Sequence, residues 1–219
     1  MALVVIGLLF LGSPQANAQP TRLGIKAAIN LSWFGGRDWN DFVRDWDNLP
    51  GLDAYNQAIV GPSAGVFVEF GVTPGLAIQP EILLGSVSGG VEVTDDVDTL
   101  SITERATVLK LPLLLKRKFD VGIDGAFYLL AGPVPVLIVG EMRSTTRGTG
   151  FATEVIEFEP DKRFVFSATF GAGYEYRFSA GALNGEIRFH RTFTDIYDDF
   201  EIRINNVNFY VGYGFNLML

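Results

Sequence analysis

Apolar and polar residues alternate with period two along most of the chain, most clearly in residues 163–178. One face of this run is aromatic or small and apolar: Phe164, Phe166, Ala168, Phe170, Ala172, Tyr174, Tyr176 and Phe178. The other face is mostly polar or glycine: Arg163, Val165, Ser167, Thr169, Gly171, Gly173, Glu175 and Arg177. Successive side chains of a strand point to opposite faces, so the pattern predicts a strand. The run is longer than the strands of about 5–6 residues usual in globular proteins and exceeds the roughly 9–11 residues that a transmembrane strand needs.

Seven further segments show the same alternation, so the sequence predicts eight strands in all. The first of them, residues 23–33, and the last, residues 206–219, are as regular as residues 163–178. The others are less regular and comprise residues 64–72, 76–85, 109–116, 123–139 and 183–193. Residues 123–139 are apolar on both faces, which makes their alternation the weakest.

Short and long connections alternate between these segments. The short ones lie near residues 73–75, 118–122 and 179–181, and the long ones near 35–60, 89–104, 141–162 and 196–205. Outer-membrane barrels have short periplasmic turns and long extracellular loops, an even strand number and no free sheet edges. The predicted fold is therefore all-β, an eight-stranded antiparallel transmembrane up-and-down β-barrel in the outer membrane of a Gram-negative cell.

The first 18 residues are predicted to be a signal peptide, and residues 19–219 to be the barrel domain. Residues 2–11 are apolar, Pro14 ends the apolar run, and Ala16-Asn17-Ala18 has the small-x-small form of a cleavage site. No Lys or Arg precedes Arg22, which is unusual for a signal peptide. A membrane anchor or a buried strand is the alternative interpretation of this segment.

The composition excludes several other classes of protein. The mean hydropathy is +0.25, but the longest apolar stretch, residues 2–12, is far shorter than the ~20 residues of a transmembrane helix. The 219 residues include no cysteine, which excludes a disulfide framework. The net charge of −8 argues against nucleic acid as a partner.

Five segments of the chain resemble a known family. They are residues 24–30 (GIKAAIN), 80–84 (PEILL), 109–116 (LKLPLLLK), 128–133 (YLLAGP) and 171–176 (GAGYEY). Their order resembles that in the PorT-like outer-membrane β-barrel proteins. The resemblance runs from about Gly24 to the C-terminus and implies an integral outer-membrane barrel. Some members are linked to protein secretion and gliding machinery, and the family pattern names no catalytic residues.

Charged residues on the inward face of the predicted barrel have both signs in similar numbers. They are Lys26, Glu69, Glu81, Lys110, Lys116, Arg163, Glu175, Arg177, Glu186 and Arg188, with His190 beside them. An eight-stranded barrel is narrow enough for side chains to fill, and unpaired buried charges are costly. We therefore expect a salt-bridged plug; a gated pore or a small-ligand site is the alternative.

The only histidine, His190, raises the possibility of an enzyme. Thr192, or Ser167 across the strand pair, would have to act as the nucleophile of an outer-membrane lipid hydrolase. Same-face neighbours on a strand usually splay, so a structural histidine is the favoured interpretation. One histidine and no cysteine also argue against zinc, and no cofactor is predicted.

The outer loops are rich in carboxylates, including Glu92, Asp95, Asp98, Asp195 and Glu201. They lack the spacing of a dedicated calcium loop. We expect them to be a contact surface, bridged in part by divalent cations to lipopolysaccharide. Trp39 and Trp46 are expected to pack within the first loop.

The sequence thus predicts a non-enzymatic protein with a structural, adhesion or secretion-complex role. Its expected partners are outer-membrane lipid, lipopolysaccharide and other envelope or secretion proteins. A soluble lipocalin-like carrier, with the two faces of each strand exchanged, is the remaining alternative.

Overall fold

The computed structural model describes residues 21–95, 97–150, 152–197 and 200–217, so the predicted signal peptide lies outside the described residues. The described elements are β1 (Arg22–Gly35), α2 (Arg37–Asp47), β2 (Asp53–Gln57), β3 (Ile59–Thr73), β4 (Leu76–Thr94), β5 (Thr99–Lys110), β6 (Leu113–Val121), β7 (Gly125–Gly148), β8 (Glu154–Phe158), β9 (Phe164–Phe178), β10 (Gly181–Thr192) and β11 (Arg203–Asn216).

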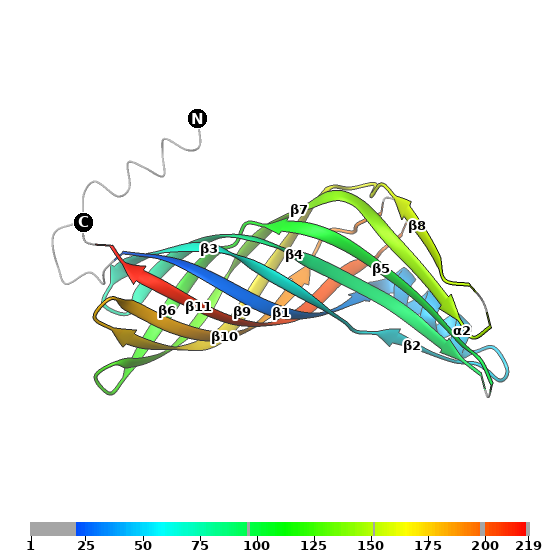
Figure 1. Cartoon of the computed structure of the whole chain (residues 1–219), viewed down its shortest axis with the longest axis horizontal. Coiled ribbons are helices and arrows are strands. Elements are labelled where there is room, and N and C mark those ends of the chain that lie inside the picture. Colours follow the sequence, from blue (N-terminus) through cyan, green and yellow to red (C-terminus); the bar gives the residue numbers. More distant parts are fainter. Residues whose placement is uncertain (1–20, 96, 151, 198–199, 218–219) are drawn as a thin grey trace.

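These strands form one closed antiparallel ring with eight positions (Figure 1). Starting from β1, the ring passes through β3, β4, the pair β5/β6, β7, β9, β10 and β11, which pairs with β1 again. Three positions each hold two strands in succession, namely β2 with β3, β5 with β6, and β8 with β9. The prediction of an eight-stranded antiparallel up-and-down barrel is confirmed.

A proline explains why one ring position is divided. Pro112 lies between β5 and β6, and proline has no N–H to donate to a ladder. The ring stays closed at this point because the Leu111 N–H donates to the Pro135 carbonyl and the Glu81 N–H donates to the Pro112 carbonyl, each at 2.9 Å. The division therefore leaves the barrel without a free edge there.

The two ends of the barrel differ. The start of β1, the end of β11 and the tight turns at residues 74–75, 122–124 and 179–180 lie at one end, and α2 and β8 lie at the other (Figure 1). Short turns mark the periplasmic side of an outer-membrane barrel. We call the first end periplasmic and the second end outer.

The outer connections contain more regular structure than predicted. Residues 89–104 are not a loop, because β4 runs to Thr94 and β5 begins at Thr99. Residues 35–60 contain α2, and residues 141–162 contain the end of β7 and all of β8. The strands continue beyond the bilayer because they still pair with one another there. The alternation of apolar and polar residues ends where lipid contact ends, so it does not mark the end of a strand.

The apolar row of each strand faces outward in the membrane-spanning part of the barrel. In β1 these exposed side chains are Leu23, Ile25, Ile29 and Leu31, and in β9 they are Phe164, Phe166, Phe170, Tyr174, Tyr176 and Phe178. Ile29 is 61% exposed, whereas its neighbour Asn30 is fully buried. A lipocalin-like carrier would have the opposite orientation, so that alternative is wrong. No helix among the described residues is long and apolar enough to cross a membrane.

The interior changes in character from one end to the other. Towards the periplasm it is charged, as predicted. Towards the outer end it is a packed apolar core: Phe34, Trp39, Val87, Val91, Val93, Ala106, Val108, Val134, Val136, Ile138, Met142, Val165, Ile196 and Ile204. The expectation of a polar interior is therefore correct for only part of the barrel.

Candidate functional site

Two clusters of ion pairs fill the periplasmic half of the lumen. In the first, Glu69 of β3 accepts from Lys116 at 2.8 Å and from Lys118 at 2.6 Å, both of β6. Lys118 also reaches Glu175 of β9 at 2.9 Å, and Arg22 lies 3.3 Å from Glu69 and 3.4 Å from Glu175. All five residues are buried. The ion pairs among them therefore compensate their charges inside the barrel, away from water.

The second cluster lies one level further from the periplasm. Arg188 of β10 donates two hydrogen bonds of 2.8 Å to Glu81 of β4. Lys26 of β1 lies 2.7 Å from Glu81 and 3.3 Å from Glu186, which also pairs with Arg188. Gln79 connects the two clusters, because its amide donates to Glu81 at 2.5 Å and its carbonyl accepts from Lys116 at 3.5 Å.

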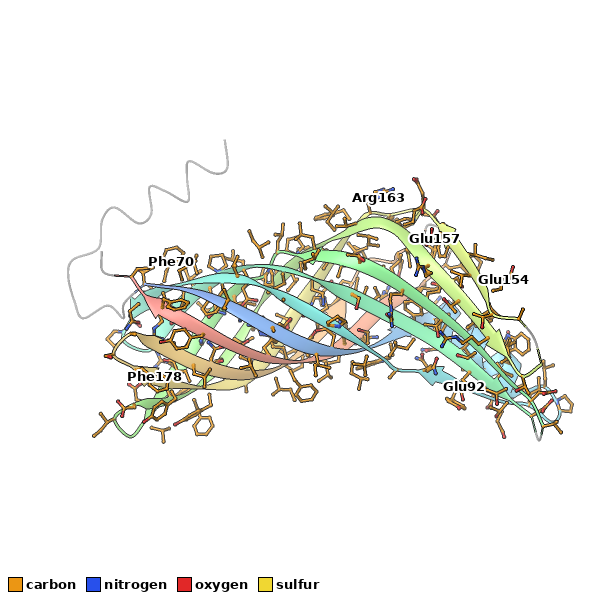
Figure 2. The ribbon with its side chains drawn as sticks, in the orientation of Figure 1. Phe70, Glu92, Glu154, Glu157, Arg163 and Phe178 are labelled. Carbon is orange, nitrogen blue, oxygen red and sulfur yellow. The ribbon has the colours of Figure 1, made fainter. Side chains whose placement is uncertain are left out.

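Eight of the ten charged residues expected in the lumen are buried there: Lys26, Glu69, Glu81, Lys110, Lys116, Glu175, Glu186 and Arg188. Arg177 lies at the periplasmic rim, where it bonds to Glu175 and Asp120. Arg163 is not in the lumen: it is exposed, lies 3.3 Å from Glu159, and is on the outside of the barrel (Figure 2). Its inclusion was wrong because β9 begins only at Phe164, so the alternation no longer governs residue 163.

Sequence reasoning missed two members of the first cluster, Arg22 and Lys118. Lys118 was assigned to a turn, but β6 continues to Val121 and turns this side chain inward. Each of them lies an even number of positions from a residue predicted to face inward: Arg22 is four residues from Lys26, and Lys118 is two residues from Lys116. Residues at even spacing on a strand share a face, which is the signal that could have found them.

A layer of mostly uncharged polar side chains separates the charged clusters from the apolar core. Ser63 donates to Asn30 at 3.2 Å, and Asn208 donates to Asn206 at 2.6 Å. Lys110 and His190 are buried here, and within the described chain the Lys110 ammonium has no hydrogen-bond partner.

The hydrolase alternative depends on this layer. Ser167 and Thr192 are hydrogen-bonded to each other at 3.0 Å. No hydrogen bond between described residues joins His190 to either hydroxyl. The histidine and its candidate nucleophiles are therefore not arranged as a catalytic pair.

A cavity of about 790 Å³ opens at the outer end, above the apolar core. Its walls are aromatic and apolar: Trp39, Phe42, Phe158, Tyr197, Phe200 and Ile202. Four carboxylates also line it: Asp38, Asp41, Asp45 and Glu104. We call this site the outer cavity.

The helix α2 supplies three of the four carboxylates. Asp38, Asp41 and Asp45 follow one another at helical spacing and so share one side of α2. Trp39 anchors the helix, because it is buried and its ring packs edge-on against Phe34 at 5.0 Å. Trp39 contacts Phe42 within the first loop, as predicted, but it also packs into the apolar core of the barrel, which was not predicted.

A glycine allows the chain to enter this helix. Gly36 has a φ of +112°, and a Cβ there would lie 2.0 Å from the Glu201 carbonyl oxygen. Asp38 accepts a hydrogen bond of 2.7 Å from the Glu201 N–H. The connection before β11 is thus held directly against the start of α2, and together they shape the outer cavity.

The carboxylates of the outer cavity differ in their surroundings. Glu104 accepts a hydrogen bond of 3.0 Å from the Tyr197 hydroxyl, and burial raises its pKa above the usual 4.5. Burial and the neighbouring Glu104 raise the pKa of Tyr197 too, so the phenol keeps its proton. Asp41 is half-buried and pairs with Arg44 at 2.8 Å. The site is therefore apolar at its walls and negative at its rim.

The acidic residues singled out from sequence lie mostly elsewhere. Glu92 bonds to Tyr55 and Gln57 on the outside of the barrel, and Asp95 accepts from the N–H groups of Val97 and Asp98 in the β4–β5 turn. Among the described carboxylates of the predicted second loop, Glu104 alone lines the outer cavity. In the described ranges, no group of three or more His, Cys, Asp or Glu side chains could hold a metal ion.

The chain is similar to one known protein family. The family model described as outer membrane protein beta-barrel domain matches residues 1–215. None of the curated proteins matches the sequence.

Several solved structures resemble the chain. OprG from Pseudomonas aeruginosa has a TM-score of 0.49 at 10% identity, covering 94% of this chain and 100% of OprG. Neisserial surface protein A has a TM-score of 0.45 at 8% identity, covering 89% and 98%. The outer-membrane protease OmpT from Escherichia coli has a TM-score of 0.43 at 7% identity, covering 93% and 98%.

Proposed function

Because the chain belongs to the outer membrane protein beta-barrel domain family, we propose that this outer-membrane protein is a closed, non-enzymatic anchor for an extracellular recognition site. The outer cavity is that site. Its partner is a basic segment of another envelope or secretion protein that carries an aromatic or apolar side chain. The proposal keeps the expectation that acidic extracellular residues make the contact. The residues concerned, however, are those of α2 and its neighbours rather than those of the second and fourth loops.

One observation carries the proposal, namely the combination of aromatic walls and carboxylates in a single cavity. A volume of about 790 Å³ is within the range of roughly 300–1,000 Å³ found for ligand sites. Aromatic rings attract cations over their faces, and carboxylates pair with them at the rim. A lysine or arginine side chain next to an aromatic one satisfies both parts of the site.

The filled lumen supports the role of an anchor rather than a channel. Charged pairs occupy its periplasmic half and apolar side chains its outer half. An open pore would need space along the whole axis. In this proposal the ion pairs act as a structural plug, and recognition takes place outside the membrane.

The experiment measures binding of a fluorescent Arg-Phe-Arg amide peptide to the purified full chain in lipid nanodiscs. The variant Asp41→Asn/Asp45→Asn/Glu104→Gln should weaken binding by about tenfold or more, since each lost ionic contact is worth roughly 1.5–3 kcal/mol where it is partly buried. Asp38 is left intact because it holds the Glu201 backbone.

The matched control is Asp53→Asn/Glu141→Gln/Glu154→Gln, which changes the net charge equally at exposed positions outside the outer cavity. The control should bind as the natural protein does. Equal loss in both variants would mean that general attraction to a negative surface explains binding, and would refute the outer cavity as the site.

We also propose that the chain belongs to the PorT-like group within its family. The five motif segments lie on β1, β4, β5/β6, β7 and β9, and four of them contribute Lys26, Glu81, Lys110, Lys116 and Glu175 to the lumen. Cross-linking in intact cells tests this: a secretion or gliding component should be captured by the natural protein. Capture should fall in the outer-cavity variant if that site makes the contact.

The hydrolase remains the second candidate from the sequence, and the geometry gives it no support. Replacement of His190 by Ala settles it, with release of fatty acid from outer-membrane lipid as the measurement. A lipid-hydrolysing activity of the natural protein that His190→Ala abolishes would revive it.

A further inference from the structure

Three arginines face outward together on the side of the barrel, just beyond the lipid-facing zone. Arg105 of β5 lies opposite Arg143 of β7, and Ser101 lies opposite Arg147 in the same sheet. Their side chains, with those of Gln57, Thr103 and Thr145, line a cleft of about 360 Å³. We call it the arginine cleft. It is unusual because the protein as a whole carries a net charge of −8.

An irregularity in strand pairing produces this cluster. On the periplasmic side Thr107 pairs with Val139, and on the outer side Arg105 pairs with Arg143, so β7 has two extra residues between the pairs. Regular pairing would place Glu141 opposite Arg105. Gly140, with φ of +80°, allows the backbone to depart from the regular strand.

The shift replaces a favourable pair with an unfavourable one. Opposite charges facing each other across a sheet are stabilising, and like charges are destabilising. Arg143 is compensated in part by Glu157 of β8 at 2.7 Å, on the exposed surface. Arg105 donates to the Ser88 hydroxyl at 3.2 Å, and no ion pair between described residues includes Arg105 or Arg147. The cleft thus has more positive than negative charge directed at one place, which an anion would relieve.

The height of the cleft indicates which anion. Leu109 and Leu137 pair with each other on the lipid-facing side of the same strands, with Leu137 exposed and Leu109 half-buried. Arg105 is four residues further along β5, about 13 Å at 3.3 Å per residue, or roughly 9 Å along the bilayer normal for a strand tilted by about 45°. Val139, opposite Thr107, is the last exposed apolar side chain of this strand pair before the arginines. The guanidinium groups therefore begin where the lipid-facing row ends, which is where lipid headgroups are expected. In Figure 2 Glu157 and Glu92, on β8 and β4 beside this surface, lie in the outer half of the molecule, far from Phe70 and Phe178.

We propose that the arginine cleft binds a phosphate group of lipopolysaccharide in the outer leaflet. Guanidinium forks match phosphate oxygens and bind them with two hydrogen bonds at a time. The Thr145 hydroxyl also lines the cleft, whereas the hydroxyls of Ser101 and Thr103 donate to the Gln57 side-chain oxygen at 3.2 and 3.4 Å. Arginine then contacts lipopolysaccharide directly, without the divalent cations that acidic loops would require.

The experiment is native mass spectrometry of the detergent-purified full chain with diphosphoryl lipid A and with the same lipid A after removal of its phosphates. The natural protein should retain diphosphoryl lipid A about tenfold or more better than the dephosphorylated lipid. The variant Arg105→Gln/Arg143→Gln/Arg147→Gln should lose that preference, since one charge-assisted hydrogen bond alone is worth about tenfold. The control Arg37→Gln/Arg44→Gln/Arg117→Gln changes the charge equally outside the cleft and should keep it.

Two measurements make each result decisive. A shift in gel mobility between unboiled and boiled samples reports whether each variant is a closed barrel, and the single variant Arg147→Gln, whose side chain makes no ion pair among described residues, serves if the triple variant does not fold. Inorganic phosphate added at millimolar concentration should not displace the lipid. Equal retention of both lipids, an unchanged triple variant or displacement by free phosphate would overturn the proposal.

Discussion

Arg188 of β10 binds both carboxylate oxygens of Glu81 of β4, and these two strands occupy opposite positions of the eight-membered ring. Four steps around the ring separate them in either direction. The ion pair therefore crosses the lumen along its diameter. Lys118 makes a second connection of this kind by contacting both Glu69 on β3 and Glu175 on β9, which also lie opposite each other.

The first prediction concerns this connection. Glu81→Ala leaves Arg188 and Lys26 buried without their shared partner, and loss of one member of a buried ion pair typically destabilises by about 3–5 kcal/mol. Urea titration in lipid vesicles, followed by the boiled and unboiled gel bands, measures the free energy of unfolding. The exposed control Glu141→Ala should change it by less than about 0.5 kcal/mol.

A double replacement tests whether the charge or the space matters. In Glu81→Leu/Arg188→Met the remaining charges, Lys26 and Glu186, still form a pair. Apolar replacement of a whole ion pair is often neutral or stabilising, so the double variant should be more stable than Glu81→Ala. A double variant as unstable as the single one would show that the pair has a role beyond charge compensation.

The second prediction concerns conduction. The natural protein should produce no steady ion current in planar lipid bilayers, because ion pairs and then apolar side chains fill the lumen. Reducing two large apolar residues of the outer core, Phe34 and Met142, to Ala should leave the current at zero, since the charged clusters below still close the barrel. Steady channels in the natural protein would contradict the plug.

The third prediction concerns pH. Since burial raises the pKa of Glu104, this carboxylate takes up its proton at a higher pH than an exposed glutamate would. Peptide binding at the outer cavity should therefore weaken as the pH falls from 7 towards 4.5, because the Glu104 carboxylate loses its charge in this range. Binding by Glu104→Gln should be weaker at pH 7 and flatter across this window.

Protonation of Glu104 should weaken peptide binding but stabilise the folded protein. A carboxyl group whose folded pKa is raised is more favourably accommodated when neutral, so its contribution to stability is present at low pH and is lost as the pH rises through the folded pKa. Glu104→Gln should thus be at least as stable as the natural protein at pH 7. A marked loss of stability at that pH would show that the charged form is the one the fold favours.

The fourth prediction concerns the entry to α2. Gly36→Ala places a side chain at positive φ and against the Glu201 backbone, which should destabilise the outer cavity by about 1–3 kcal/mol. The barrel itself should still form and shift on heating. Limited proteolysis should show faster cleavage near residues 193–202, and peptide binding should fall. Gly51→Ala is the control, since Gly51 also has positive φ but has space for a Cβ.

The sequence was sufficient for the barrel because each lipid-facing row is long and regular. Leu23, Ile25 and Ile29 could face only lipid once the strand period was recognised, and the inward parity of Lys26 and Glu81 then followed. The same reasoning fails for Arg163 and Lys118, because the alternation of inward and outward side chains holds only within a strand. Arg163 lies just before β9 begins, and Lys118 lies within β6, which is longer than predicted.

The outer cavity could not be found in this way. Glu104 and Tyr197 are 93 residues apart, and nothing in the local sequence of either indicates that they meet. The helix α2 was within reach, since Trp39, Phe42 and Trp46 recur at helical spacing in a segment assigned to a loop. The arginine cleft depends on a pairing shift at Gly140 that period-two analysis would have reversed, by placing Glu141 beside Arg105.

The two-part interior assigns closure of the wall and the shape of the exposed end to different residues. The residues that connect opposite strands, among them Glu69, Glu81 and Arg188, are towards the periplasm, and those that line the outer cavity are at the other end. A side chain exchanged at the outer end can therefore change the surface that faces the surroundings without removing an ion pair of the two charged clusters. The barrel stays closed at its base while its exposed face is rebuilt.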